Sequence, residues 1–296
     1  MIVHCVLLHC EKTVLSWTLE NPETYVNTDR GSTPKRIALN AFIGFIVGLA
    51  GGLVGLGGAE LRLPYLAGTL RLPLKTAIPV NLAVSLITLL AALPTRLYTL
   101  NTASLIPFLI ETSALGLGAV LGAYVGVSGL KHLSPVALQR SVFTLLVALG
   151  FVMIGESVVA FTPVGFLRNP MILRISSALV LGLLIGAISG VLGVAGGEVI
   201  IPTLILAFGA PIKVAGSLSQ MVSIPTVLTG FLRHYRAGSL NNRDIAMWLI
   251  LWMGLGAIAG GIAGGLLSSL APSGFLKALL GVILIASSVK VFVKKS

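Results

Sequence analysis

The sequence predicts an all-α polytopic membrane protein built from two copies of one unit, and three observations support this. Hydrophobic residues make up 56% of the 296-residue chain and charged residues only 10%, with a mean hydropathy of +1.02. Ordinary soluble domains carry about 25% charged residues. Long apolar runs fill most of the chain, and a pattern of Gly, Glu and Pro occurs once in each half. The chain is therefore expected to lie in a bilayer.

Each expected crossing is an apolar run of about 20 residues, the length that an α-helix needs to span about 30 Å of hydrocarbon. The runs are continuous and lack the period-two alternation of a transmembrane β-barrel, and a helix satisfies its own backbone groups in lipid. Eight runs qualify, namely 37–57, 76–95, 103–130, 135–156, 171–195, 213–232, 245–270 and 275–293. They leave no room for a soluble domain.

The first 36 residues differ from the rest, and we interpret residues 1–36 as a hydrophilic, poorly ordered cytoplasmic tail. They hold four of the nine acidic residues and too short an apolar patch for a secretion signal. Cys5 and Cys10 lie here beside His4 and His9. A chance cluster in a tail is the favoured interpretation of these four residues, so neither a metal site nor a cofactor is expected.

The formal net charge of +11 does not indicate nucleic-acid binding in so apolar a chain. Lys and Arg gather in the cytoplasmic loops of membrane proteins. With eight crossings and the N-terminus inside, eleven basic residues fall inside and five outside. The distribution favours both termini in the cytoplasm. The expected location of this multi-pass protein is the cell membrane, that is, the prokaryotic inner membrane.

The two halves are related by an offset of 138 residues, which takes Gly52 to Gly190 and Glu60 to Glu198. Over 48–66 this offset gives seven identities in nineteen positions, and it continues without a gap to align GLGAVLGAYVG with GLGAIAGGIAG. An offset held over so long a stretch indicates an internal duplication. We expect membrane repeats at 37–160 and 171–296, each of about four transmembrane helices.

Each unit opens with a helix that runs into glycines, GGLVGLGGAELRLP in one copy and SGVLGVAGGEVIIP in the other. Such glycines destabilise a helix by about 1 kcal/mol each relative to Ala. Pro64 and Pro202 then suit the first turn of a new helix. The pieces that follow are too short to cross, so each is expected to be a half-helix or part of a re-entrant segment.

Gly/Pro-interrupted segments at matching positions in two halves are typical of a transporter's binding site. Helix starts at Pro64 and Pro202 would aim N–H groups and partial positive charge at a bound anion. The later glycine stripes, at 116–126 and 254–264, are better explained by helix packing. Four crossings per unit would make the copies parallel, and counting the short piece as a fifth would make them inverted. Charge bias does not decide between these topologies.

The candidate substrate-binding residues surround the two breaks, and half-helix glycines are expected to leave room for substrate. They are Gly55, Gly57, Gly58, Glu60, Arg62, Pro64, Asn81 and Ser85 in the first copy, and Gly193, Gly196, Gly197, Glu198, Pro202, Ser219, Gln220 and Ser223 in the second.

Ionisable groups inside a membrane are functional candidates by default. Glu60 and Glu198 are the proton-coupling candidates, because two buried negative charges beside an anion repel unless one carries a proton. The alternative is that each carboxylate caps backbone N–H groups at its helix break. Arg62, which has Ile200 as its counterpart, would contact the anion or neutralise Glu60. Arg96 is expected to be an anchor at the membrane interface, with a gate as the second alternative.

These residues resemble the sulfite exporter family of the TauE/SafE type, in which a duplicated membrane unit opens with a Gly-rich stretch and a proline. The resemblance covers essentially residues 37–295. It implies secondary, not ATP-driven, transport of small sulfur-containing anions such as sulfite or organosulfonates. The expected partners are this inorganic or organic anion and the lipid bilayer, with no nucleic acid; a homo-oligomer stays open.

Two other functions remain open. An anion channel or uncoupled facilitator would differ from a carrier in that its flux does not saturate. An intramembrane serine protease is a remote alternative, suggested by GVSG at 126–129, but His132 and His234 are not placed to serve it. No phosphate-binding loop for ATP occurs and no soluble domain could hold one, so an ATP-driven pump is excluded unless a partner supplies the motor. An enzyme is not expected.

Overall fold

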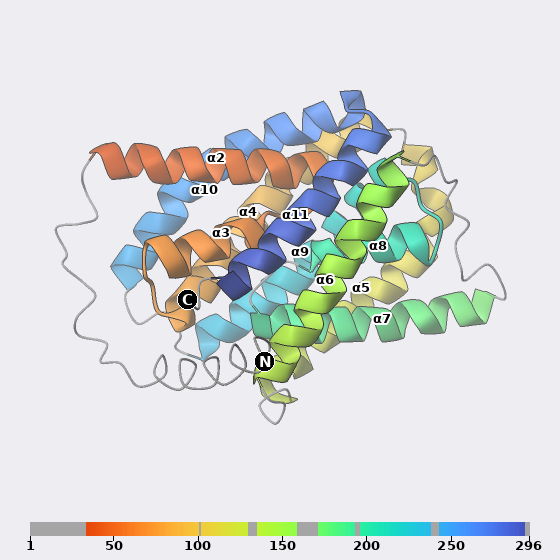
Figure 1. The fold of residues 1–296 in the computed structure, drawn as a ribbon, viewed down its shortest axis with the longest axis horizontal. Helices are drawn as coiled ribbons and strands as arrows, with labels where there is room; N and C mark the ends of the chain where they lie inside the picture. The colour runs from red at the N-terminus through yellow and green to blue at the C-terminus, as the bar shows by residue number, and fades with distance from the viewer. Residues whose placement is uncertain are drawn as a thin grey trace, which may run out of the picture.

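The computed structural model describes residues 34–100, 102–129, 135–158, 171–192, 196–237 and 243–293, and every regular element in these ranges is helical (Figure 1). The predicted all-α fold is therefore confirmed. The expected tail at 1–36 lies outside the described residues apart from its last three, which begin the first helix. Gly193 also lies outside them.

The first repeat contains four long helices and one short broken one. They are α2 (Pro34–Val54), α3 (Ala59–Pro64) continued by the π-helical η3 (Tyr65–Thr69), α4 (Leu74–Thr99), α5 (Leu109–Gly129) and α6 (Pro135–Val158), with 3-10 turns η4 (Thr102–Ser104) and η5 (Ile106–Phe108) before α5.

The second repeat contains the same series at the same offset. Its helices are α7 (Met171–Leu192), α8 (Gly197–Leu206), α9 (Ile212–Arg236), α10 (Arg243–Leu270) and α11 (Ser273–Val293). Even the turns after the short helices agree, since the equivalent residues Arg71 and Gly209 have positive φ angles of 53° and 75°. The predicted pair of repeats, each of four long helices and a half-helix, is confirmed.

The two repeats are intertwined, because the first helix of each packs along the third long helix of the other. The α2 helix lies against α10, and α7 lies against α5. Contacts keep register along these pairs: Gly44 lies against Met253 and Gly52 against Gly261, so α2 and α10 run in the same direction. The glycine stripes predicted to serve packing do so, as at Gly260, where a Cβ would meet the backbone of α2.

Equivalent helices of the two repeats run antiparallel. Near one end of α4, Arg96 bonds Ser217 at the start of α9, whereas Leu82 lies near Gly230 toward the end of α9. The α6 and α11 helices likewise cross with opposite directions, and α2 and α7 run in opposite senses across the upper and lower parts of Figure 1. The repeats are therefore inverted, which decides between the two topologies that charge bias left open.

Inversion requires an odd number of passes per repeat. The four long helices make four passes, and the broken segment makes the fifth. The Arg96 side chain donates to the Gly52 carbonyl oxygen at 2.8 Å, so α2 and α4 end at the same level. From there the chain returns through α3 to Tyr65, whose hydroxyl donates to Asn40 Oδ1 near the start of α2 at 2.9 Å. The span from Asn40 to Val54 is about 20 Å of helix, so the break and half-helix recross most of the molecule.

Five described segments are long and apolar enough to cross a membrane, by length and composition. They are Pro34–Val54, Leu74–Thr99, Thr102–Val125, Met171–Gly190 and Asp244–Leu270. Three expected crossings, at 135–156, 213–232 and 275–293, are not among them, and α6 and α11 contribute only the shorter apolar helices Leu146–Val158 and Ser273–Ala286. The remaining expected crossing, 213–232, lies within α9. This helix carries buried polar side chains, including Ser219 and Gln220, and is enclosed by other helices. It is therefore polar because it lies inside the bundle.

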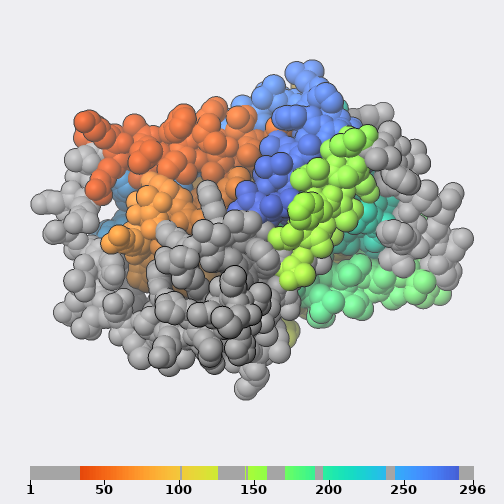
Figure 2. All heavy atoms as spheres, in the orientation of Figure 1, coloured from red at the N-terminus to blue at the C-terminus, as the bar shows by residue number. Residues whose placement is uncertain are grey.

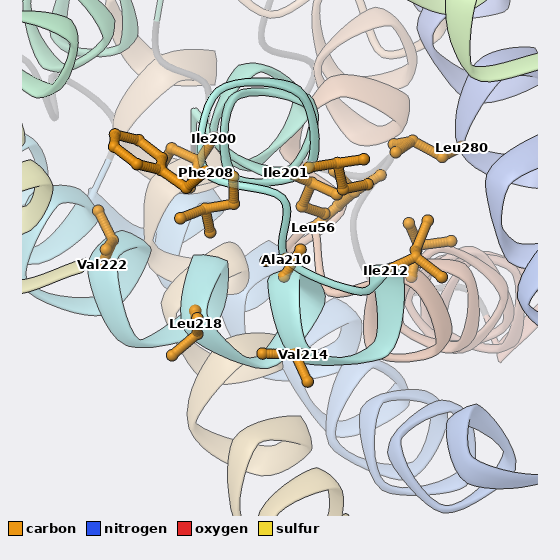
Figure 3. Close-up of a cluster of buried hydrophobic side chains, with 14 of the residues drawn as sticks. Leu56, Ile200, Ile201, Phe208, Ala210, Ile212, Val214, Leu218, Val222 and Leu280 are labelled. Atoms are coloured by element: carbon orange, nitrogen blue, oxygen red, sulfur yellow. The ribbon is translucent and has the colours of Figure 1, made fainter. Parts of the chain in front are cut away.

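The hydrophobic core gathers around the second repeat's short helix. Leu56, from the first break, packs beside Ile201 of α8, with the start of α9 below them (Figure 3). The α6 and α11 helices lie side by side on the face shown in Figure 2. Large apolar side chains such as Leu117 and Ile172 are exposed on the outer helices, as suits contact with lipid tails.

The inverted topology can be tested with single cysteines in a variant without Cys5 and Cys10. Lys35→Cys and Met171→Cys mark the starts of α2 and α7, which are equivalent helices in the two repeats. An odd number of passes puts them on opposite sides of the membrane. We expect a membrane-impermeant maleimide to label one site in intact cells and the other only in inverted vesicles. Labelling of both from one side would contradict the inversion.

The glycine stripe can be tested by Gly260→Leu. A side chain at this position would meet the Phe45 carbonyl oxygen and, at 2.7 Å, the Leu49 amide nitrogen. Overpacking of this kind costs about 1–3 kcal/mol, so we expect a lower thermal unfolding midpoint in detergent. The matched control is Gly155→Leu, because a Cβ at Gly155 meets nothing within 4 Å. Equal midpoints for the two variants would contradict the packing role.

Candidate functional site

The first break is a tight turn made of glycines. Gly55, Gly57 and Gly58 have φ angles of 104°, 101° and 75°, in the region that side chains strongly disfavour. Gly196, the counterpart of Gly58, has a φ of 74°. Gly58 and Gly196 are the residues that directly precede the two short helices. Their positive φ angles require glycine at both positions.

The short helices begin earlier than the sequence predicted. They start at Ala59 and Gly197, whereas starts at Pro64 and Pro202 were expected. That expectation is wrong because a left-handed glycine already permits the helix to begin. Pro64 ends α3, and Pro202 lies within α8. Neither proline has an N–H, so the carbonyl oxygens four residues earlier lose their usual helical donors; these carbonyls belong to the two glutamates.

The glycines that start the short helices do not border open space. A Cβ at Gly58 would lie 2.6 Å from Val47 Cγ1, and one at Gly196 would collide with Ser189 Oγ. Their expected role of leaving room for substrate is not supported by this geometry. Positive φ angles and close packing account for both positions.

The two breaks contact each other across the repeat boundary. Gly55 lies directly against the backbone of Gly216, near the start of α9. A Cβ at Gly197 would lie 3.2 Å from both Leu56 Cα and Ser219 Oγ. The inverted halves therefore bring the starts of their short helices together in the interior.

Glu60 and Glu198 occupy the first turns of α3 and α8, and each is only 4% exposed. The carboxyl oxygens of Glu60 have no hydrogen-bond partner, and neither does Oε2 of Glu198. The two groups are close enough to interact electrostatically. Placement in a helix's first turn is favourable for a carboxylate, but these unpartnered oxygens do not act as side-chain caps.

Arg62 is completely buried, and α4 holds its guanidinium. Nη1 donates to Ser85 Oγ at 3.0 Å and to the Asn81 carbonyl oxygen at 3.5 Å, and Nη2 donates to Thr88 Oγ1 at 3.3 Å. Its interaction with Glu60 acts at longer range, because no ion pair within 4.0 Å joins them. Nε has no partner. The guanidinium is thus a fixed internal cation with spare donor capacity.

The second repeat lacks this cation, since Ile200 stands where Arg62 would be. Ser219, Gln220 and Ser223 of α9 are fully buried, and their side-chain polar atoms have no partner. A buried polar group without a partner costs about 1–3 kcal/mol. Such groups are normally satisfied by water or a ligand. The polar side chains of α9 near the breaks therefore need hydrogen-bond partners from outside the protein.

Two basic residues hold the ends of the first helices of the two repeats, a role not predicted from the sequence. Arg96, predicted to lie at the membrane interface, is completely buried, so that prediction is wrong. It donates to the carbonyl oxygens of Gly52 and Leu53, both at 2.8 Å. His234, its counterpart at the same offset, lies 3.2 Å from the Gly190 carbonyl oxygen. The shared offset was the signal that could have revealed this pair.

Arg96 also reaches the second repeat, where Nε donates to Ser217 Oγ at 3.1 Å and Nη2 to the Lys213 carbonyl oxygen at 3.0 Å. It therefore satisfies the carbonyls that the glycine break exposes and ties the repeats together. Ser128, the serine of the GVSG motif, has a side chain that the structure does not describe. His132 lies wholly outside the described residues. His234 is engaged with the backbone of α7.

Comparison with known proteins gives two matches. The family model described as sulfite exporter TauE/SafE matches residues 6–153 and 178–296. A relative, the probable membrane transporter protein YunE of Bacillus subtilis (strain 168), is 24% identical over 224 residues, covering 67% of this chain and 78% of its own. No solved structure gives a significant match. With both repeats covered by the family model, the chain belongs to the TauE/SafE family of membrane transporters.

Proposed function

We propose that this membrane transporter is a secondary carrier of small sulfur-containing anions, such as sulfite or organosulfonates, in the prokaryotic inner membrane. The observation that carries the proposal is the meeting of two inverted helix breaks around Glu60 and Glu198, with buried polar atoms that lack protein partners. Polar groups at such depth mark substrate and ion pathways.

The charges at the breaks support an anion whose binding depends on protons. Arg62 is a fixed positive charge, and the two carboxyl groups contribute between zero and two negative charges. With both ionised, the net charge of these three groups is negative and repels an anion. With both protonated, it is positive and attracts one. Binding of an anion and of protons is therefore cooperative, which is the thermodynamic basis of coupling.

The inverted repeats support alternating access. In transporters built this way, one repeat rocks against the other around a fixed central site. Equivalent helices here exchange roles under a two-fold rotation, so the same set of contacts can close either side of the site. The Arg96 contacts with α9 would close one side, and the His234 region would close the other.

An uncoupled facilitator is the second candidate function, because the α9 polar groups would bind an anion in the positive field of Arg62 without any proton. It would show saturable uptake that follows the anion gradient alone. A channel would show uptake that rises in proportion to concentration. The described residues give no support to the protease alternative.

Proton coupling can be tested with Glu60→Gln and Glu198→Gln in proteoliposomes. For wild type, we expect uptake of radiolabelled sulfite to accelerate when the outside is made more acidic than the inside. At the coupling residue, Gln keeps the hydrogen-bonding capacity but cannot exchange a proton. That variant should retain anion exchange at equal pH and lose its response to the pH difference.

Glu156→Gln is the control, since Glu156 pairs with Lys277 at 2.9 Å, away from the breaks. It should keep the pH response of wild type. If all three variants respond to the pH gradient as wild type does, coupling through the break glutamates is refuted. A merely structural role would instead lower the unfolding midpoint of Glu60→Gln or Glu198→Gln without altering the pH response.

A further inference from the structure

Equivalent positions in the two repeats are satisfied to very different extents. The offset pairs Asn81 with Ser219 and Ser85 with Ser223. The first member of each pair lies on α4 beside α3, and the second lies on α9 beside α8. A symmetrical binding site would treat these pairs alike, so their difference carries information.

In the first repeat the protein bonds the hydroxyls of α4 and the Asn81 amide nitrogen, whereas both carboxyl oxygens of Glu60 and Nε of Arg62 have no partner. Arg62 donates to Ser85 Oγ and Thr88 Oγ1. Asn81 Nδ2 donates to the Ala59 carbonyl oxygen at 3.0 Å, and Ser85 Oγ donates to the Asn81 carbonyl oxygen at 2.7 Å. The hydroxyl groups of α4 are therefore bonded within the protein, and the unpartnered atoms of this half belong to the charged side chains of α3.

In the second repeat the matching surface is left without partners. Ile200 provides no donor, and Ser219 Oγ, Ser223 Oγ and both polar atoms of Gln220 are unpartnered at zero exposure. Gln220 is an addition, because its counterpart in the first repeat is Leu82. Oε2 of Glu198 is also unpartnered.

These side chains come together on one side of α9 and at the start of α8. Ser219 and Ser223 are four residues apart and share a helix face, with Gln220 next to them. Ser219 Oγ would lie 3.2 Å from a Cβ at Gly197, the residue before Glu198. The serine hydroxyl therefore lies directly beside the first turn of α8.

We propose that the oxygen atoms of the transported oxyanion are bound by the second repeat alone, through Ser219, Gln220 and Ser223 of α9, while Arg62 serves the first repeat as a structural cation. This rests on the proposed function, anion transport, and assigns its binding site to one half of the duplicated unit. Two hydroxyls and one carboxamide supply neutral donors for up to three oxyanion oxygens. Arg62 contributes its field but not its bonded N–H groups.

The chemistry suits a sulfur oxyanion better than a compact halide. A sulfite or sulfonate group offers three acceptor oxygens spread around one sulfur atom, which matches three separate donors. Glu198, in its protonated form, adds a fourth donor and removes the repulsion that its carboxylate would exert. The same three donors would also accept the sulfonate of an organic anion.

The test compares substrate affinity and stability for Ser219→Ala, Gln220→Leu and Ser223→Ala. Leu is chosen at 220 because the first repeat carries it at the equivalent position. Uptake of radiolabelled sulfite into proteoliposomes should show a KM raised about 10-fold by each change, as expected for loss of one hydrogen bond to a charged ligand. Unfolding midpoints without substrate should not fall, since no protein partner is lost.

Two matched controls should behave in the opposite way. Thr88→Val removes an acceptor for Arg62, and Ser268→Ala removes a buried hydroxyl that donates to the Gly265 carbonyl oxygen at 2.7 Å. Both should lower the unfolding midpoint and leave KM for sulfite within about 2-fold of wild type, because neither residue would touch the anion.

The outcomes separate this inference from the proposed function. If wild type takes up neither sulfite nor methanesulfonate, anion transport itself is wrong. If wild type transports sulfite but the three α9 variants keep its KM, the α9 groups hold only water and the inference is overturned. A raised KM for Thr88→Val with unchanged α9 variants would assign the site to Arg62 and the first repeat instead.

Discussion

The structure depends on one constraint, which is that backbone interrupted within a membrane must be satisfied by the protein itself. Glycines at 55, 57 and 58 follow the end of α2 at Val54, so carbonyl oxygens in its last turn lack helical donors. Arg96 supplies the missing donors from α4. The break is thus stable only because a cation is buried beside it and because the second repeat covers it.

This constraint explains why the repeats are intertwined and inverted. A single repeat would expose its break and its half-helix. Inversion places the second break against the first, with Gly55 beside Gly216 and Gly197 beside Leu56. The glycine stripes of α5 and α10 then allow close approach of α7 and α2, so that each repeat's broken helix is held by its neighbour. Helix packing and the site follow from the same arrangement.

Much of the fold could be predicted from the sequence, because apolar run length and a fixed offset are properties of the chain alone. The offset of Glu60 to Glu198 correctly located both breaks. The starts of the short helices could not be predicted. Whether α3 begins at Pro64 or directly after Gly58 depends on the left-handed backbone conformation of Gly58, which the sequence does not reveal. The number of crossings could not be predicted either. The α3 helix is too short to be recognised as a membrane span, yet it carries the chain back across the molecule.

The residues of the candidate site could be selected from the sequence, but their contacts depend on the tertiary structure and could not be predicted. Ser219, Gln220 and Ser223 could be selected as polar residues in an apolar helix. That their counterparts Asn81 and Ser85 are already bonded by α3 could not be predicted, because it depends on where the Arg62 side chain reaches. The burial of Arg96 was missed for a similar reason, since a basic residue at a helix end is usually an interfacial anchor.

The most direct test of the central claim is disulfide crosslinking between the two breaks in native membranes. Leu56 and Ile201 belong to different repeats and pack in one buried cluster (Figure 3). In a variant lacking Cys5 and Cys10, Leu56→Cys with Ile201→Cys should crosslink on mild oxidation and block anion uptake until reduced. Leu56→Cys paired with Ile172→Cys, on the exposed face of α7, should not crosslink. Absence of the first crosslink, or equal crosslinking of both pairs, would contradict the claim that the inverted breaks meet inside the protein.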